Sequence, residues 1–156
     1  MSDIDALTSK LTNLDAAIED ALRNEVAQVV KDALVESARV NVYEAYTPKF
    51  ESRRNGHGGI RDPNSIVVEV RGTELIAIDT IPGVDDDMGW QQLKGGSVPS
   101  GRLADAIAHG MYGAPPRPFH EKAKEELLHS GSLEDALRRG LARQGIDASD
   151  VSFGFK

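Results

Sequence analysis

Apolar residues recur at steps of three and four along the first third of the chain, which is the spacing of one face of an α-helix. No glycine or proline interrupts this pattern between Asp15 and Tyr46, and several of its positions are alanine, which permits close packing. The pattern therefore predicts a long helix over residues 15–46, preceded by a shorter amphipathic turn that ends near Leu11. Such a helix extends about 45 Å at roughly 1.5 Å per residue. We expect it to pack on a sheet or on a copy of itself.

Two long polar stretches interrupt the regular patterns further along the chain. Pro48 ends the helix, because proline disfavours helical geometry in the residue before it. Residues 49–64 follow as a stretch longer than most connections in compact domains, which predicts an extended loop or arm. Residues 82–101 form a second long loop, rich in glycine, that holds the single tryptophan, Trp90.

A strand pattern lies between these two loops. Residues 66–70 are mostly β-branched, and residues 74–81 form a second apolar run after a turn that contains Gly72. We therefore predict an antiparallel β-hairpin over residues 65–81. Asp79 lies among isoleucines, and we expect it to face solvent at the edge of the hairpin.

Helical spacing returns in residues 102–156. The sequence predicts a short helical turn over 103–109, a helix over 118–129 and a second helix over 132–144. The last residues alternate Val151, Phe153 and Phe155, which predicts a terminal strand. The predicted fold is a single α+β domain over residues 1–156, with a long N-terminal helix packed on a small antiparallel β-sheet, two shorter C-terminal helices and long loops.

Local signals also mark the ends of the last helix. Ser132 and Asp135 have the spacing of a capping box, with aspartate in place of the usual glutamate. Gly145 is placed to end the helix, because glycine adopts the left-handed conformation that a helix C-terminus often requires.

Charge and composition argue against several classes of protein for this chain. The formal net charge is −7 and the pI is about 5.1, which argues against a protein that coats nucleic acid. The chain has no cysteine, so disulfides and thiolate metal sites are excluded. The acidic N-terminus does not resemble a signal peptide, and no apolar run approaches the ~20 residues that span a bilayer. We expect a protein assembled in the cytosol, without membrane contact.

Candidate catalytic and metal-binding residues form no recognisable motif. The four histidines are spread over three predicted elements, and none has the spacing of a metal pair. The three consecutive aspartates in the second loop lack the alternating pattern of a calcium loop. We therefore expect no catalytic residue, no metal and no cofactor. The enzymatic alternative is a metal-dependent hydrolase or nuclease, and its residues would be His57, Asp62, Glu69, Asp85, Asp86 and Asp87.

Basic residues gather in the first loop of this acidic chain: Lys49, Arg53, Arg54, His57 and Arg61. Such a loop is typical of a salt-sensitive contact with an acidic partner. Three partners are open: another copy, a different protein or DNA phosphate. The pattern also fits an exposed loop with ordinary solubilising charges. Trp90 in the second loop either contributes to an interface, where tryptophan concentrates binding energy, or covers the exposed face of the hairpin.

The order of the elements, together with three short motifs, resembles the head–tail joining or tail-completion proteins of tailed bacteriophages. The motifs are "LADAIAHG" (residues 103–110), "PPRPFHEKAKEEL" (115–127) and "LEDALRRGLARQGI" (133–146). The stretch "YEAYTPKFESRRNGHGGIRDPNSI" resembles a variant of this family found among phage structural proteins. The likeness covers residues 15–146, and the chain departs from it at residues 110–112 and in the length of the 82–101 loop.

The resemblance implies a structural virion protein that forms a ring of six or twelve copies at the head–tail neck or tail top. Its implied partners are further copies of itself and adjacent neck, connector or tail-tube proteins, and DNA would pass through the ring without specific binding. The implied location is the virion, after assembly in the host cytoplasm, and no enzymatic activity is implied. The alternative is a small cytosolic protein-binding adaptor that acts through the arginine loop.

The resemblance also gives the polar loops the role of arms that contact other subunits. In the "RPF" turn, Pro118 suits the first turn of a helix, Phe119 is expected to pack into the core, and Arg117 is expected at the surface, paired with an acidic neighbour. The expected interface residues are Tyr46, Lys49, Arg53, Arg54, His57, Arg61, Trp90 and Arg117.

Overall fold

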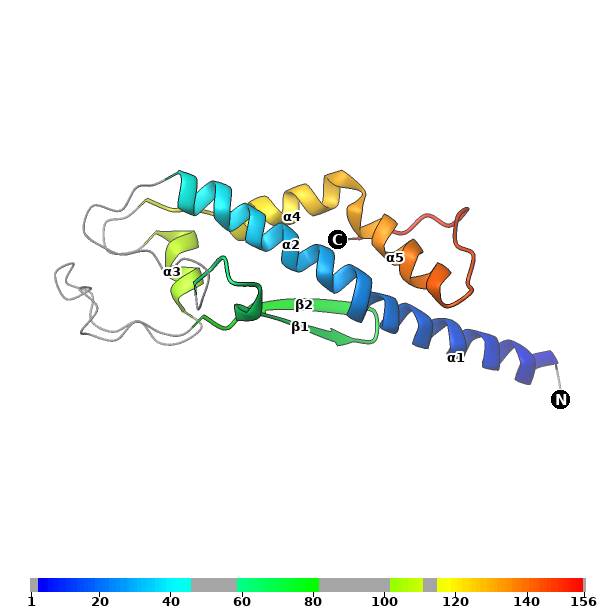
Figure 1. Ribbon diagram of the computed structural model, residues 1–156. Helices are drawn as coiled ribbons and strands as arrows, with labels where there is room; N and C mark the ends of the chain where they lie inside the picture. The colour runs from blue at the N-terminus through cyan, green and yellow to red at the C-terminus, as the bar shows by residue number, and fades with distance from the viewer. Residues whose placement is uncertain (1–2, 46–58, 82–101, 111–114, 156) are drawn as a thin grey trace. The chain divides into compact units, whose positions relative to one another are not determined.

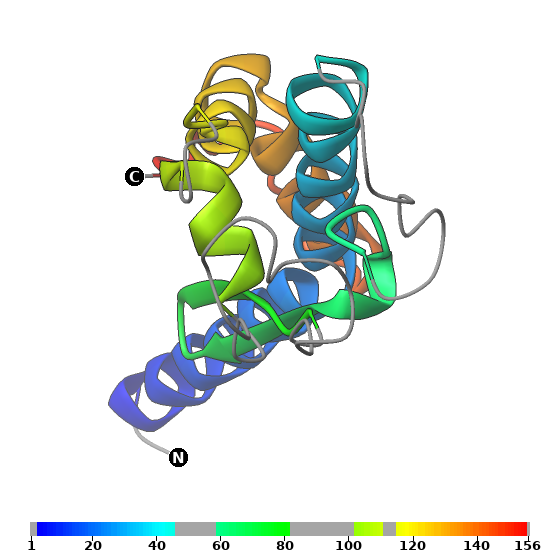
Figure 2. The ribbon, with the colours of Figure 1, turned by 90° about the vertical axis from the view of Figure 1, so that its left-hand side faces the viewer.

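The computed structural model describes residues 3–45, 59–81, 102–110 and 115–155. One continuous helix occupies residues 3–44 and is visible in both views (Figure 1 and Figure 2). Its parts are α1 (Asp3–Ala21), the π-helical segment η1 (Leu22–Val26), α2 (Ala27–Ala38) and the π-helical segment η2 (Arg39–Glu44). The remaining elements are the 3₁₀ turn η3 (Pro63–Ser65), β1 (Ile66–Arg71), β2 (Glu74–Asp79), α3 (Leu103–His109), α4 (Phe119–Ser130) and α5 (Ser132–Arg143).

These elements confirm the predicted α+β class, with a long N-terminal helix, a two-stranded antiparallel sheet and two C-terminal helices. The long helix begins at Asp3 rather than near Asp15, because the predicted short turn and the predicted long helix are one element. Two π-helical segments interrupt its α-helical hydrogen bonding. That the chain forms a single domain stays a prediction.

Contacts group the chain into two compact units, described separately below. The first comprises residues 1–30, 68–77 and 127–156, and the second comprises residues 31–67 and 78–126.

In the first unit, α5 packs along α1 and η1. Small residues face each other here: Ala17 and Ala21 of α1 are buried, and Gly140 of α5 lies directly against Ala21. The larger buried side chains of this unit include Leu22, Val26, Leu133, Leu137 and Leu141. The alanines of the N-terminal helix therefore serve a close contact with α5, a partner that differs from the sheet or second copy that the sequence analysis expected.

Polar groups at the end of α5 strengthen this contact. Arg143 donates from Nε to Glu25 Oε1 at 2.7 Å and also pairs with Asp20. Gln144 Nε2 donates to the Ala17 carbonyl oxygen at 2.9 Å. The paired carboxylates, first that of Glu25, hold the pKa of Arg143 above its ordinary range.

The ends of α5 differ in how well the sequence predicted them. The C-terminal prediction is confirmed: Gly145 has a φ of 78°, and the amides of Gly145 and Ile146 donate to the carbonyls of Ala142 and Leu141. The predicted capping box is wrong. Gly131, with a φ of 72°, occupies the N-cap position without a side-chain cap, and the Ser132 hydroxyl bonds to that of Ser130 instead.

The predicted terminal strand is also wrong, because residues 151–155 pair with no strand among the described residues. This tail is held by α5 instead. Arg138 donates to the Val151 carbonyl oxygen at 2.9 Å, and the Phe153 amide donates to Glu134 Oε1 at 3.2 Å. Side chains of α5 therefore satisfy backbone groups that a neighbouring strand would otherwise pair.

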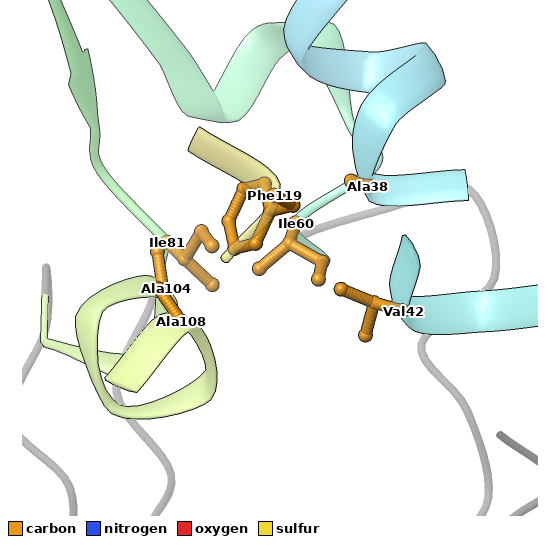
Figure 3. Close-up of a cluster of buried hydrophobic side chains, with 7 residues drawn as sticks. All are labelled: Ala38, Val42, Ile60, Ile81, Ala104, Ala108 and Phe119. Carbon is orange, nitrogen blue, oxygen red and sulfur yellow. The ribbon is translucent and has the colours of Figure 1, made fainter. Parts of the chain in front are cut away.

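In the second unit, a cluster of buried apolar side chains surrounds Phe119, the first residue of α4 (Figure 3). Phe119 is 1% exposed, as predicted for this residue. The other members come from the long helix, the end of the first loop, the end of the hairpin and α3: Ala38, Val42, Ile60, Ile81, Ala104 and Ala108.

One buried polar side chain connects two helices of this cluster. Ser37 Oγ donates to the Phe119 carbonyl oxygen at 2.7 Å and accepts from Asn41 Nδ2 at 3.0 Å. Ser37 is 4% exposed, so water cannot readily replace it as the partner of either group.

Replacing Ser37 with alanine is expected to lower the free energy of unfolding by about 1–2 kcal/mol, because the Phe119 carbonyl loses its buried donor. Urea denaturation followed by circular dichroism measures the change. Ser9→Ala is the matched control, since Ser9 is an exposed helical serine. Equal stability of the two variants would show that the Ser37 hydroxyl contributes nothing.

The hairpin lies where the sequence predicted it, although β2 ends at Asp79 rather than at Ile81. Gly72 has a φ of 59° in the two-residue turn. The expectation for Asp79 is wrong. Its side chain is 9% exposed, and its Oδ2 lies 2.5 Å from His120 Nε2 of α4. An imidazole from a helix far along the chain has replaced water as its partner, which strand alternation alone cannot predict.

Candidate interaction surface

Two of the expected interface residues, Arg61 and Arg117, lie in the described part of the chain. The others lie outside the described residues: Tyr46, Lys49, Arg53, Arg54, His57 and Trp90. Asp85, Asp86 and Asp87 of the enzymatic alternative also lie outside them.

The end of the first loop, residues 59–65, is fixed to the second unit. Ile60 is 5% exposed within the Phe119 cluster (Figure 3). The Asp62 amide donates to the Gly59 carbonyl oxygen at 3.0 Å, and Asp62 Oδ1 accepts from the Asn64 amide at 2.9 Å. Asp62 therefore has a structural role as the cap of η3, with Pro63 in its first turn.

A further pair of bonds closes the hairpin beside this turn. The Ser65 carbonyl oxygen accepts from the Thr80 amide at 2.7 Å and from the Thr80 hydroxyl at 3.0 Å. The predicted arm is thus joined to the hairpin through a turn with well-defined hydrogen bonding.

Arg61 is exposed within this fixed turn and lies beside the end of the long helix. Its guanidinium carbon is 5.7 Å from the centroid of the Tyr43 ring, within the range of a cation–π contact. Tyr43 packs against the Phe119 cluster, so the ring under Arg61 is held in place. The sequence prediction named Tyr46 and missed Tyr43, although both belong to the same "VYEAY" stretch.

Charged groups on the long helix lie near Arg61. Arg39 Nε donates to Glu36 Oε2 at 2.7 Å, and Arg39 also pairs with Glu44. The hydrogen bond from Arg39 is the main cause that holds the pKa of Glu36 below its ordinary value, and the charge of Arg61 acts in the same direction. Arg61 therefore belongs to a surface of mixed charge, with Glu36 as an acidic neighbour from the same chain.

Arg117, which was expected at the surface, is partly exposed. Its amide donates to the carbonyls of Ile107 and Ala108 at 3.1 and 3.0 Å, and the Phe119 amide donates to the Arg117 carbonyl oxygen at 2.7 Å. The "RPF" turn therefore joins the end of α3 to the start of α4. The pairing of Arg117 with an acidic neighbour stays a prediction.

The described residues contain no group of three or more histidine, aspartate or glutamate side chains placed to hold a metal ion. Glu69 pairs with Arg71 at 2.7 Å on β1, and His109 pairs with Asp105 at 3.0 Å within α3. Of the residues that the enzymatic alternative named, Asp62 and Glu69 are described, and each has a partner within its own element or turn.

A second surface, which the sequence prediction did not single out, lies at the start of α1. Four large apolar side chains on it are exposed: Ile4, Leu7, Leu11 and Leu14. They recur at steps of three and four, so they lie on one side of the helix. The signal was present in the sequence as an apolar periodicity, and the structure adds that no described residue covers it.

Comparison with models of protein families gives a match over most of the chain. A family model described as YomN matches residues 3–143. No curated protein and no solved structure matches the chain. Among the helices that the structure describes, none is long and apolar enough to span a membrane.

Proposed function

The chain belongs to the YomN family, and from this membership we propose that it is a structural virion protein that joins head and tail in a tailed phage. The family is phage-derived, so the protein is phage-associated. The proposed location is the head–tail neck or the tail top, and the proposed assembly is a ring of six or twelve copies. Its proposed partners are adjacent neck, connector or tail-tube proteins, and we propose no enzymatic activity.

The observation that carries the proposal is the family match over nearly the whole chain, from residue 3 to residue 143. The same region holds the order of elements that resembles the tail-completion proteins, and the structure has these elements in that order. The "RPF" turn has the packing that this resemblance implies, with Phe119 buried at the start of α4.

Charge supports the proposed passage of DNA. The formal net charge of −7 disfavours tight association between the protein and phosphate groups. Local basic groups such as Arg61 would then contact acidic protein neighbours rather than DNA, which is consistent with the mixed charges around Glu36.

Loss of the gene from a phage that carries it is expected to leave DNA-filled heads and complete tails unjoined. Electron microscopy of the lysate distinguishes joined from unjoined particles, and plaque counts follow infectivity. Expression of the intact gene in trans restores joining. Normal particles after gene loss would refute the proposal.

Arg61→Glu is expected to weaken assembly roughly tenfold or more, because arginine is enriched among residues that dominate interface energy. Ring formation by the purified protein is measured by size-exclusion chromatography with light scattering. Lys124→Glu makes the same change in charge at an exposed position of α4 and serves as the control. Equal assembly by both variants would remove Arg61 from the interface.

A further inference from the structure

The first turns of α1 form a helix without cover from the rest of the described chain. Every residue from 4 to 16 is exposed. The exposed fractions of the four large apolar residues among them are 75% for Ile4, 58% for Leu7, 55% for Leu11 and 37% for Leu14. Within the first unit these turns extend past the end of α5 (Figure 1). Four regularly spaced large apolar groups on one exposed helix mark an interaction site rather than scattered surface residues.

The uncovered stripe continues the side of α1 that α5 covers. Burial begins at Ala17, whose carbonyl oxygen accepts from Gln144 at the end of α5. A helical segment of about 12–15 residues is marginal in water without tertiary contacts. A partner that packs on the stripe would therefore stabilise the helix as well as cover its apolar groups.

The spacing of the stripe is that of a coiled-coil seam. Ile4 and Leu11 occupy the a positions of two heptads, and Leu7 and Leu14 occupy the d positions. Thr8 and Thr12, outside the seam, donate to carbonyls four residues earlier in their own helix. A seam of this kind is complementary to an identical helix, because each side chain fits between those of its copy.

Charges beside the seam favour a parallel pair of copies. Lys10 occupies a g position and Asp15 the e position five residues later, and both are exposed. In a parallel pair, Lys10 of one copy lies opposite Asp15 of the other, whereas in an antiparallel pair g positions face g positions and lysine meets lysine. The α1 segment has five acidic residues and one basic residue, so an anionic membrane is a poor occupant.

We propose that residues 4–14 of α1 pair in parallel with the same residues of a second copy of this chain. Two heptads bury much less than the ~800 Å² per partner of a typical stable complex. The contact therefore strengthens an oligomer in which other surfaces already hold the copies at high effective concentration. This inference rests on the proposed function: the pair is two-fold symmetric, so it joins copies of the ring two by two and adds to the head-to-tail contacts that close the ring.

Cross-linking tests the pairing in the full chain, which has no native cysteine. In a parallel pair, d positions of the two copies approach within the ~4.4–6.8 Å between Cα atoms that a disulfide requires. Leu7→Cys is expected to form a disulfide-linked dimer roughly tenfold faster than Ser9→Cys, whose side chain lies on the opposite side of the helix. Non-reducing gel electrophoresis at high protein concentration measures both rates. Equal rates would overturn the proposal and would favour a different occupant.

Charge exchange tests the orientation independently. Lys10→Asp or Asp15→Lys alone is expected to weaken self-association, and the double variant is expected to restore it, measured by analytical ultracentrifugation at low salt. Failure of the double variant to restore association would overturn the parallel arrangement. An oligomer whose dissociation constant is unchanged when Leu7 and Leu11 are both changed to glutamate would sink this inference and leave the ring proposal intact, whereas normal joining after gene loss would do the reverse.

Discussion

Replacement of Gly140 by valine is expected to lower the free energy of unfolding by roughly 3 kcal/mol, because the site has no room for a side chain. A Cβ atom at this position would lie 2.4 Å from the Ala21 Cβ, 2.9 Å from the Ala21 Cα and 2.7 Å from Glu25 Oε2. The first two atoms belong to a packed helix and cannot move away by a rotamer change. The helices α5 and α1 would therefore have to separate, with loss of the contacts between them.

For Gly140→Ala, the sign of the change in the free energy of unfolding is the test, because helix propensity and crowding predict opposite signs. At an exposed helical position this substitution stabilises a helix by about 1 kcal/mol, because glycine is a poor helix former. Here we expect it to destabilise the protein, since even one methyl group meets the Ala21 backbone. Urea denaturation followed by circular dichroism measures both variants.

Two further variants complete this test. Arg139→Ala changes the neighbouring exposed residue of α5 and should leave stability nearly unchanged. Ala21→Gly combined with Gly140→Ala removes the methyl–methyl overlap and should recover part of the loss. If Gly140→Ala proved as stable as the unchanged protein, the close approach of α5 to α1 would be wrong.

The regular elements could be predicted because their signals are local. Hydrophobic steps of three and four mark the long helix, β-branched residues mark β1, and Gly145 marks the end of α5. The predicted start of the long helix was wrong, because residues 3–14 carry the same periodicity as the rest and contain no residue that breaks a helix. The π-helical segments follow no local signal that we identify.

The wrong predictions share a different cause, which is contact between residues far apart in the sequence. Asp79 is covered because His120 lies 41 positions later and reaches its carboxylate. The C-terminal tail forms no strand because Arg138 and Glu134 of α5 bond to its backbone. Periodicity describes which side of an element is apolar, but it cannot identify the polar partner that another element supplies.

The sequence could suggest which type of residue lies at the candidate surface, but not which residues become its neighbours. The sequence singled out Arg61 as part of a basic loop on an acidic chain, and its role at an interface stays a prediction. Tyr43 and Glu36 become its neighbours through folding of the loop end onto the long helix. The apolar stripe of α1 was visible in the sequence. Its exposure was not, because a buried stripe and an uncovered one have the same periodicity.

Phe119→Ala is expected to lower the free energy of unfolding by about 3–5 kcal/mol, the range for removal of a buried aromatic side chain. Phe119 is 1% exposed and contacts side chains from the long helix, the loop end, the hairpin end and α3 (Figure 3). These segments meet at this ring, so its loss leaves a cavity that no single segment can fill. We therefore expect all segments of the second unit to lose their packing in one step rather than one after another.

The position of Phe119 also connects stability to the proposed contact surface. Ile60 packs in the same cluster and immediately precedes Arg61, so loss of the ring should release the turn that holds Arg61 beside Tyr43. Hydrogen exchange of the amides of residues 60–65 measures this release, and urea denaturation measures the overall loss. Leu128→Ala removes an exposed apolar side chain from the same helix and should change neither. Leu128 is 41% exposed and Phe119 is 1% exposed, so similar results for the two variants would mean that the cluster around Phe119 does not hold the second unit together.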